Sequence, residues 1–234
     1  MGVVFSYALL AGLATALIVA AVTDLRSRTI ANRLNLAIAL AAPLYWLAVG
    51  YSWVDLVFML GQTALTFVFC TALFAARQMG GGDVKLLTAL ALWFPPLAFF
   101  ELVFMMAVLG GGASVAMALA NMQRRPGETV RDAIGALATG LWVFAAAGIA
   151  FSLMTGRPVF GDPAILAGNM MKNTALLVAA TALVLGVTLF GLFHVVRRQK
   201  GKLRMPYGIA IAAGGLWILG EQAVSTARFG ANLG

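Results

Sequence analysis

Long apolar runs dominate the sequence, and they constrain the fold more than any other feature. Residues 84–120 are almost entirely apolar, and several other runs approach or exceed the roughly 20 residues that a helix needs to cross a bilayer. The runs are continuous rather than alternating, which disfavours a transmembrane β-barrel. Because 62% of the residues are hydrophobic and only 10% are charged, the sequence predicts an all-α, polytopic membrane protein without a soluble domain.

The apolar runs predict about eight membrane segments in a single domain over residues 1–234. Pro95-Pro96 interrupts the longest run, because proline lacks an amide proton and disfavours helix at the preceding residue. This run therefore divides into a short segment, about Val84–Phe94, and a full span, about Leu97–Ala120. The other predicted segments are about Val3–Thr23, Leu34–Val49, Val54–Ala76, Ala133–Met154, Thr174–Val196 and Tyr207–Ala223.

The distribution of basic residues supports this count. With the Pro95-Pro96 turn outside the cytoplasm, all of the 16 Lys and Arg residues fall on one side except Arg157, Lys172 and Arg228. Cytoplasmic loops are enriched in Lys and Arg, so both termini are expected outside the cytoplasm. Loops that face anionic lipid also account for the net charge of +8. Membrane lipids are therefore expected partners, and nucleic acid is not.

Asp24 and Asp83 stand out among the eight carboxylates. Asp24 ends the first predicted span and Asp83 precedes the short segment, so the topology brings both to the cytoplasmic edge of the membrane. A lone carboxylate there is equally well explained as a helix cap, whereas ionisable groups at membrane depth usually mark function. For the other six carboxylates we favour structural roles in caps, ion pairs or turns: Asp55, Glu101, Glu128, Asp132, Asp162 and Glu221.

Three glycines, Gly80, Gly81 and Gly82, directly precede Asp83. Glycine destabilises a helix by about 1 kcal/mol per residue, so we expect a helix break here. Without Cβ atoms, these residues can also admit a close approach by another segment. Asp83 is then expected at the N-terminus of the following helix, near its amides and its positive dipole end. Taken alone, this motif also fits an ordinary loop with a capping aspartate.

Three patches together resemble the type IV prepilin peptidases, which are intramembrane aspartyl peptidases with a Gly-x-Gly-Asp signature. Gly80–Leu87 is similar to their Gly-x-Gly-Asp-x-Lys-Leu motif, and Asp24–Asn32 is similar to their other aspartate segment. Met205–Gly214 is similar to the Pro-Tyr/Phe-Gly start of their last helix. The resemblance is closest to the small members of the CpaA or TadV type, which serve Flp (tight-adherence) pili.

The resemblance implies a membrane-embedded aspartyl endopeptidase with Asp24 and Asp83 as its catalytic pair. Its substrate would be a prepilin or pseudopilin, with a basic leader, a glycine before the cut and an apolar helix. Cleavage is expected at the cytoplasmic edge of the bacterial cytoplasmic membrane, without a cofactor or metal. The substrate-binding or supporting residues implied are Gly80, Gly81, Gly82, Lys85, Arg28 and Asn32.

Two differences from the family's sequence pattern limit which of the family's properties are expected in this protein. Ala31 stands where the family commonly has proline. The larger bifunctional members also have a cytoplasmic region with paired Cys-x-x-Cys motifs, which is associated with N-methylation of the new terminus. The single cysteine here, Cys70, lies inside a predicted span. N-methyltransferase activity is therefore not expected.

Two alternatives remain open beside this interpretation. Presenilin-type and signal-peptide-peptidase-type proteases also have a Gly-x-Gly-Asp motif, but their first aspartate lies in a Tyr-Asp context inside the membrane. Thr23-Asp24 at the end of a span disfavours that type. The non-enzyme alternative is a small ion- or proton-coupled transporter that uses Asp24 and Asp83 as ligands. Such a protein is expected to have acidic residues near the midplane and often inverted repeats.

Overall fold

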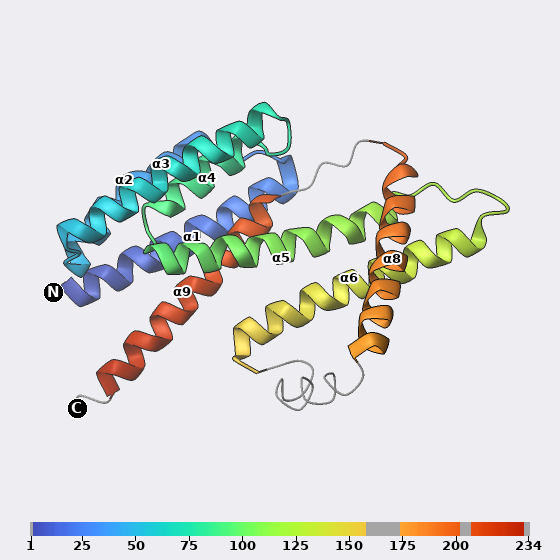
Figure 1. Cartoon of the computed structure of the whole chain (residues 1–234). Helices are drawn as coiled ribbons and strands as arrows, with labels where there is room; N and C mark the ends of the chain where they lie inside the picture. The colour runs from blue at the N-terminus through green and yellow to red at the C-terminus, as the bar shows by residue number, and fades with distance from the viewer. Residues whose placement is uncertain (1, 158–173, 202–206, 232–234) are drawn as a thin grey trace. The chain divides into compact units, whose positions relative to one another are not determined.

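The computed structural model describes residues 2–157, 174–201 and 207–231, and this part of the chain is helical without any strand. Every predicted segment coincides with one helix, so the all-α prediction and the division at Pro95-Pro96 are confirmed. Lys172, Lys202, Arg204 and Pro206 lie outside the described residues. The helices are α1 (Gly2–Ser27), α2 (Asn32–Val49), α3 (Trp53–Ala75), α4 (Gly81–Ala91), α5 (Pro96–Ala120), α6 (Thr129–Thr155), α8 (Thr174–Arg197) and α9 (Tyr207–Ala231) (Figure 1).

Five of these helices are long and apolar enough to cross a membrane: Val4–Ser27 of α1, all of α3, α5 and α6, and Val178–Arg197 of α8. Many of their large apolar side chains are exposed, as is expected of helices that face lipid. The protein is therefore a polytopic helical membrane protein. That α2, α4 and α9 also enter the membrane stays a prediction.

The chain forms two compact units. Unit 1 consists of Met1–Ala107 and Pro206–Gly234, and unit 2 consists of Val108–Met205. The helix α5 begins in unit 1 and ends in unit 2. The prediction of one domain over residues 1–234 is not tested by this division and stays a prediction.

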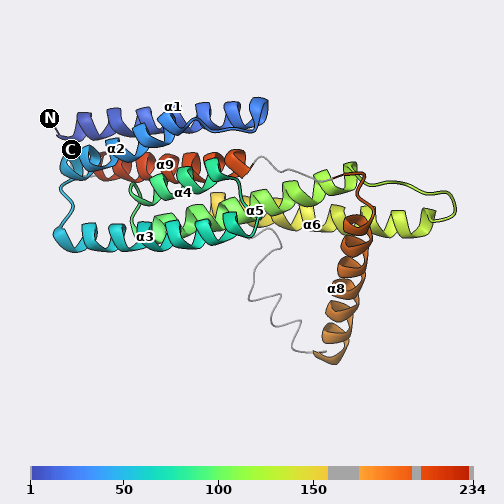
Figure 2. The same cartoon turned by 90° about the horizontal axis from the view of Figure 1, so that it is seen from above.

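The short helix α4 is the buried element of unit 1, where it lies among α2, α3 and α9 (Figures 1 and 2). Seven of its 11 residues are buried, as is typical of a helix that packs on several sides. Its length of about 17 Å is well below the roughly 30 Å of a hydrocarbon core. A helix this short can lie at membrane depth only if other helices enclose it and satisfy the polar groups at its ends.

Side chains from α2 and α3 satisfy the carbonyl groups at the C-terminal end of α4. Gln62 Nε2 donates hydrogen bonds to the carbonyl oxygens of Ala91 at 2.7 Å and Phe94 at 2.6 Å. Trp46 Nε1 donates to the carbonyl oxygen of Leu92 at 2.6 Å. The last carbonyl groups of any helix lack intrahelical partners, so these two side chains allow α4 to end inside the protein.

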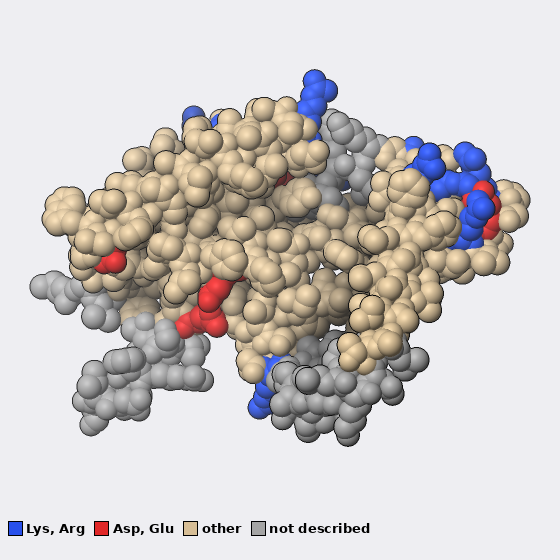
Figure 3. Space-filling model, viewed as in Figure 1, with Lys and Arg blue, Asp and Glu red and all other residues tan. Residues whose placement is uncertain are grey.

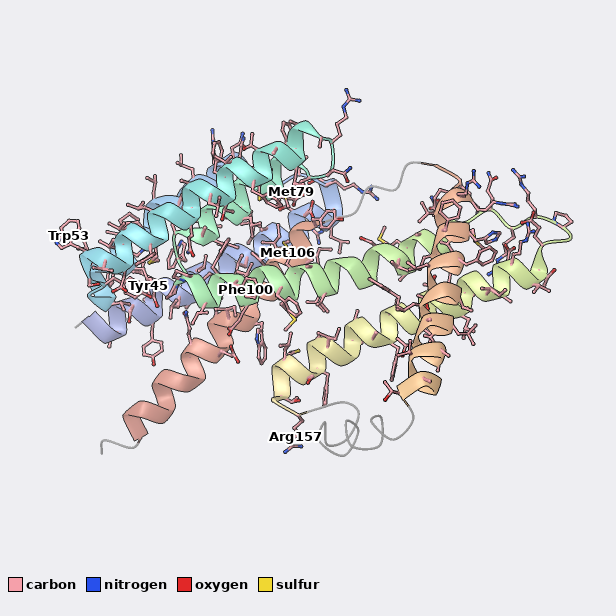
Figure 4. All side chains as sticks on the ribbon, in the orientation of Figure 1. Tyr45, Trp53, Met79, Phe100, Met106 and Arg157 are labelled. Atoms are coloured by element: carbon pink, nitrogen blue, oxygen red, sulfur yellow. The ribbon has the colours of Figure 1, made fainter. Side chains whose placement is uncertain are left out.

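Aromatic packing holds the segment after α4 in place. The indole of Trp93 is fully buried, stacks on Tyr45 of α2 with 5.3 Å between ring centroids, and donates from Nε1 to the carbonyl oxygen of Ile38 at 2.8 Å. Tyr45 is labelled in Figure 4. The turn that leads to Pro95-Pro96 is thus anchored to α2.

In unit 2, α6 and α8 pack closely through small residues. A Cβ atom on Gly191 would lie 2.5 Å from the Cβ of Ala138 and 2.9 Å from the carbonyl oxygen of Ile134. On the facing helix, a Cβ on Gly135 would lie 2.9 Å from Val195. Small residues permit such close approach between membrane helices.

We expect Gln62→Leu to lower the free energy of unfolding in detergent micelles by about 1–3 kcal/mol, because two buried carbonyl groups lose their donor. Thr63→Val is the matched control, since the Thr63 hydroxyl bonds only within α3, to the carbonyl oxygen of Met59 at 2.7 Å. That control is expected to change the stability by about 0.5 kcal/mol or less. Equal effects of the two substitutions would show that Gln62 does not support α4.

Candidate active site

Asp24 lies near the end of α1, and its side chain contacts the start of α9. Its carboxylate is buried, with 6% of the residue exposed, and its Oδ2 accepts a hydrogen bond of 2.9 Å from the amide of Gly208. Gly208 lies in the first turn of α9, where amides have no partner within the helix. The positive end of the helix dipole also favours a negative charge at this point. The contact joins positions 184 residues apart.

The contact between Asp24 and Gly208 requires glycine. A Cβ atom at position 208 would lie 2.7 Å from Oδ2 and 2.9 Å from Cγ of Asp24. The motif Met205–Gly214 contains Gly208, and it is the sequence signal for this residue. The sequence does not pair Gly208 with Asp24, because that contact depends on how α9 packs against α1.

Asp83 lies on α4 itself, in the first turn, and only 8% of the residue is exposed. Its carboxylate lies against the backbone of Gly80, the N-cap residue. A Cβ atom on Gly80 would lie 2.8 Å from Asp83 Oδ2. The predicted helix break thus falls at Gly80, while Gly81 and Gly82 belong to α4. First-turn amides need no helical partner, so flexible glycines are tolerated there.

The structure brings the two aspartate segments together inside unit 1. Asp24 is close enough for its charge to act on the carboxyl group of Asp83. A Cβ atom on Gly82 would lie 3.3 Å from the Cβ of Ile30, in the segment that follows Asp24. Asn35 Nδ2 donates to the carbonyl oxygen of Gly82 at 3.3 Å. The glycines therefore do admit a close approach, and the segment that approaches is the one that follows Asp24.

Two arginines in left-handed backbone conformation flank these segments. Arg28 has a φ of 54° and Arg77 a φ of 58°, and they are the two non-glycine residues with positive φ in the described chain. Such conformations are unfavourable for residues with a Cβ, and they cluster at functional sites. Arg28 also acts electrostatically on Asp24, so its side chain belongs to the surroundings of the site.

Lys85 and Asn32 contact each other, and Lys85 lies on another face of α4 than Asp83. Lys85 Nζ donates to Asn32 Oδ1 at 2.8 Å, and both residues line an apolar groove of about 390 Å³ beside α2, α3 and α4. Residues that are two positions apart in a helix are separated by about 200° of rotation about its axis. Lys85 and Asp83 therefore lie on different faces of α4. A substrate-binding role for Lys85 and Asn32 stays a prediction.

Ala31 adopts the backbone that the family's proline would impose. Its φ is −63° and its ψ is 132°, and proline fixes φ near −65°. Although Ala31 replaces the family's proline, the chain between α1 and α2 therefore keeps a backbone path that the family motif allows.

One group of side chains in the described residues could hold a metal ion, and it belongs to unit 2. Glu128, Asp132 and His194 offer ligand atoms within 4.8 Å of one another. Glu128 already pairs with Arg198 and lies 3.9 Å from Arg131. The predicted ion pairing of Glu128 in this basic segment is thus observed, and Asp24 and Asp83 are not part of the group.

The sequence model of the type IV leader peptidase family matches residues 11–115 of this chain. Both Asp24 and Asp83 lie within the match. Through this region, which is slightly less than half of the chain, the protein is similar to the type IV leader peptidase family. The match supports a peptidase of that type, and it contains the first two of the three sequence patches, Asp24–Asn32 and Gly80–Leu87. No curated protein and no solved structure matches the chain.

We expect Gly208→Ala to lower peptidase activity by about a hundredfold, because displacement of a catalytic group by about 1 Å has that effect. The new Cβ would overlap the Asp24 carboxylate. Gly220→Ala is the control on the same helix, since a Cβ there meets nothing within 4 Å. Activity and thermal unfolding of both variants in detergent micelles make the test. Wild-type activity in Gly208→Ala would contradict the role of this contact.

Proposed function

We propose that this peptidase is an aspartic endopeptidase that removes the leader peptide of prepilins. The observation that carries the proposal is that two buried carboxylates, Asp24 and Asp83, lie on segments that pack together at Ile30 and Gly82, within the region that matches the peptidase family. Buried ionisable groups in a membrane protein are costly and mark functional sites. Two carboxylates from distant segments supply the acid and the base that acid–base hydrolysis requires.

In the proposed mechanism the two carboxyl groups share one proton, because two close carboxylates do not both ionise at neutral pH. The ionised group takes a proton from water while the oxygen of that water attacks the scissile carbonyl carbon. The protonated group donates its proton to the carbonyl oxygen. Collapse of the tetrahedral intermediate then breaks the C–N bond, and the leaving nitrogen takes up a proton. Both apparent pKa values belong to the pair.

Backbone contacts orient the pair for this chemistry. Gly208 holds Oδ2 of Asp24, so the other oxygen, Oδ1, is the one that we assign to water or to the shared proton. The backbone of Gly80 lies against the carboxylate of Asp83. Lys85 and Asn32 support the site indirectly in this proposal: their hydrogen bond joins α2 to α4 across 53 positions and so positions the loop that leads to Asp83.

The proposed location is the cytoplasmic edge of the bacterial cytoplasmic membrane. Arg26 and Arg28 directly follow Asp24, and basic residues near the end of a span favour the cytoplasmic side. Water is available at that edge, whereas the hydrocarbon interior holds little. The apolar helix of a prepilin fits the membrane, and its basic leader fits the cytoplasm. The resemblance to the small CpaA or TadV type supports Flp prepilins as the substrates.

We expect Asp24→Asn and Asp83→Asn each to reduce leader removal by about a hundredfold to ten-thousandfold, the range for loss of a general acid or base. The assay combines purified full-length protein with Flp prepilins and identifies the new N-terminus by mass spectrometry. Glu101→Gln is the control, because Glu101 is an exposed carboxylate on the candidate span α5. It is expected to keep wild-type activity.

Cleavage by either Asn variant at the wild-type rate would refute the aspartic mechanism. If the wild-type protein cuts other prepilins but leaves Flp prepilins intact, the substrate assignment is wrong while the mechanism stands. A transporter that uses Asp24 and Asp83 as ligands would instead show ion-dependent flux in liposomes and no new N-terminus.

A further inference from the structure

Unit 2 contains a cavity of about 420 Å³ at the N-terminal end of α6 and the C-terminal end of α8. Figure 3 shows Lys and Arg side chains gathered over the loop between α5 and α6. We call this cavity the arginine cavity. It is lined by Arg125, Arg131, Phe190, Phe193, His194, Arg197 and Arg198.

Backbone hydrogen bonds fix the two segments that carry these arginines. The amide of Gln123 donates to the carbonyl oxygen of Arg198 at 2.7 Å, and the amide of Lys200 donates to that of Asn121 at 3.0 Å. The Gln199 side chain donates to the carbonyl oxygen of Ala118 at 2.9 Å. The backbone segments on both sides of the arginine cavity are therefore joined to each other.

Positive charge exceeds negative charge in the arginine cavity. The nearby carboxylates already have partners, since Glu128 pairs with Arg198 and Asp132 pairs with His194 at 2.8 Å. Neither Arg125 nor Arg197 belongs to an ion pair observed among the described residues. Arg198 Nη1 is buried and has no hydrogen-bond partner in the described part of the chain. The cavity therefore has four guanidinium groups and only two carboxylates nearby. This excess of positive charge favours the binding of an anion with several acceptor oxygens.

Aromatic rings give the arginine cavity an apolar side. Phe190 and Phe193 are about half exposed, at 49% and 59%, and the guanidinium of Arg197 lies 5.1 Å from the ring centroid of Phe193. These residues lie in the last turns of α8, within the candidate span Val178–Arg197. The cavity thus combines phosphate-binding groups with an apolar wall at the end of a membrane helix.

We propose that the arginine cavity binds the phosphate headgroup of an anionic phospholipid, with an acyl chain along Phe190 and Phe193. A free phosphate ion would use the guanidinium groups but not the aromatic wall. A divalent cation on Glu128, Asp132 and His194 would have to displace Arg198 and would face the surplus positive charge. This lipid site is separate from the peptidase chemistry and does not depend on the proposed substrate.

The test measures lipid adducts of the purified full-length protein by native mass spectrometry in micelles with equal amounts of phosphatidylglycerol and phosphatidylcholine. We expect preferential phosphatidylglycerol binding that falls by about tenfold or more in Arg125→Gln/Arg197→Gln, because each basic residue near an anionic lipid contributes roughly a factor of five. Arg124→Gln/Lys200→Gln is the matched control: it removes the same charge from the same segments, but both residues line a neighbouring cavity. The control is expected to keep the preference.

Each other outcome overturns the lipid site. Equal losses in the two double variants would show charge attraction without a defined site, and equal binding of the two lipids would show no headgroup recognition. Displacement of the lipid by millimolar inorganic phosphate would identify a free-anion site. Loss of binding in EDTA, with recovery in Mn²⁺, would identify a cation site on Glu128, Asp132 and His194. Far-ultraviolet circular dichroism confirms that both double variants are folded before binding is compared.

Discussion

Two buried carboxylates of unit 1 each lie against the N-terminal end of a helix, at a glycine. A buried charge without a partner is strongly unfavourable, but the amide of Gly208 donates a hydrogen bond to Asp24, and the backbone of Gly80 lies against Asp83. At both glycines a Cβ atom would lie within 2.8 Å of a carboxylate oxygen. Each helix end can contact its aspartate because glycine has no side chain at that position.

The same arrangement explains why α4 is short and why polar residues occur in apolar spans. The start of α4 has to meet the segment after Asp24, and its far end lies within the protein rather than in water. Its terminal carbonyl groups therefore need donors from neighbouring helices, which Gln62 and Trp46 provide. A glutamine in the otherwise apolar α3 is consequently part of the support of the site.

The helices could be predicted from sequence because the length of an apolar run and the position of a proline determine helix formation locally. Their ends were less predictable: α1 continues past Thr23 to Ser27, and α6 begins at Thr129 rather than Ala133, since a helix can extend into polar residues beyond lipid. Asp24 and Asp83 could be selected because carboxylates are rare in this chain. Their partner Gly208 could not, because it depends on how α9 packs against α1. The hydrogen bond between Lys85 and Asn32 could not be predicted either, because it depends on how α2 packs against α4.

The region that matches the family and the residues that form the candidate site are not the same. The match covers residues 11–115 and includes both aspartates, but the amide that holds Asp24 comes from α9, far beyond that region. Without α9, Asp24 would lose its only observed side-chain hydrogen bond in the described part of the chain. The carboxylate would then have to turn toward water or take up a proton. The proposed site therefore includes the C-terminal helix as well as the matched region, and Gly208 belongs to it beside the residues of the family signature.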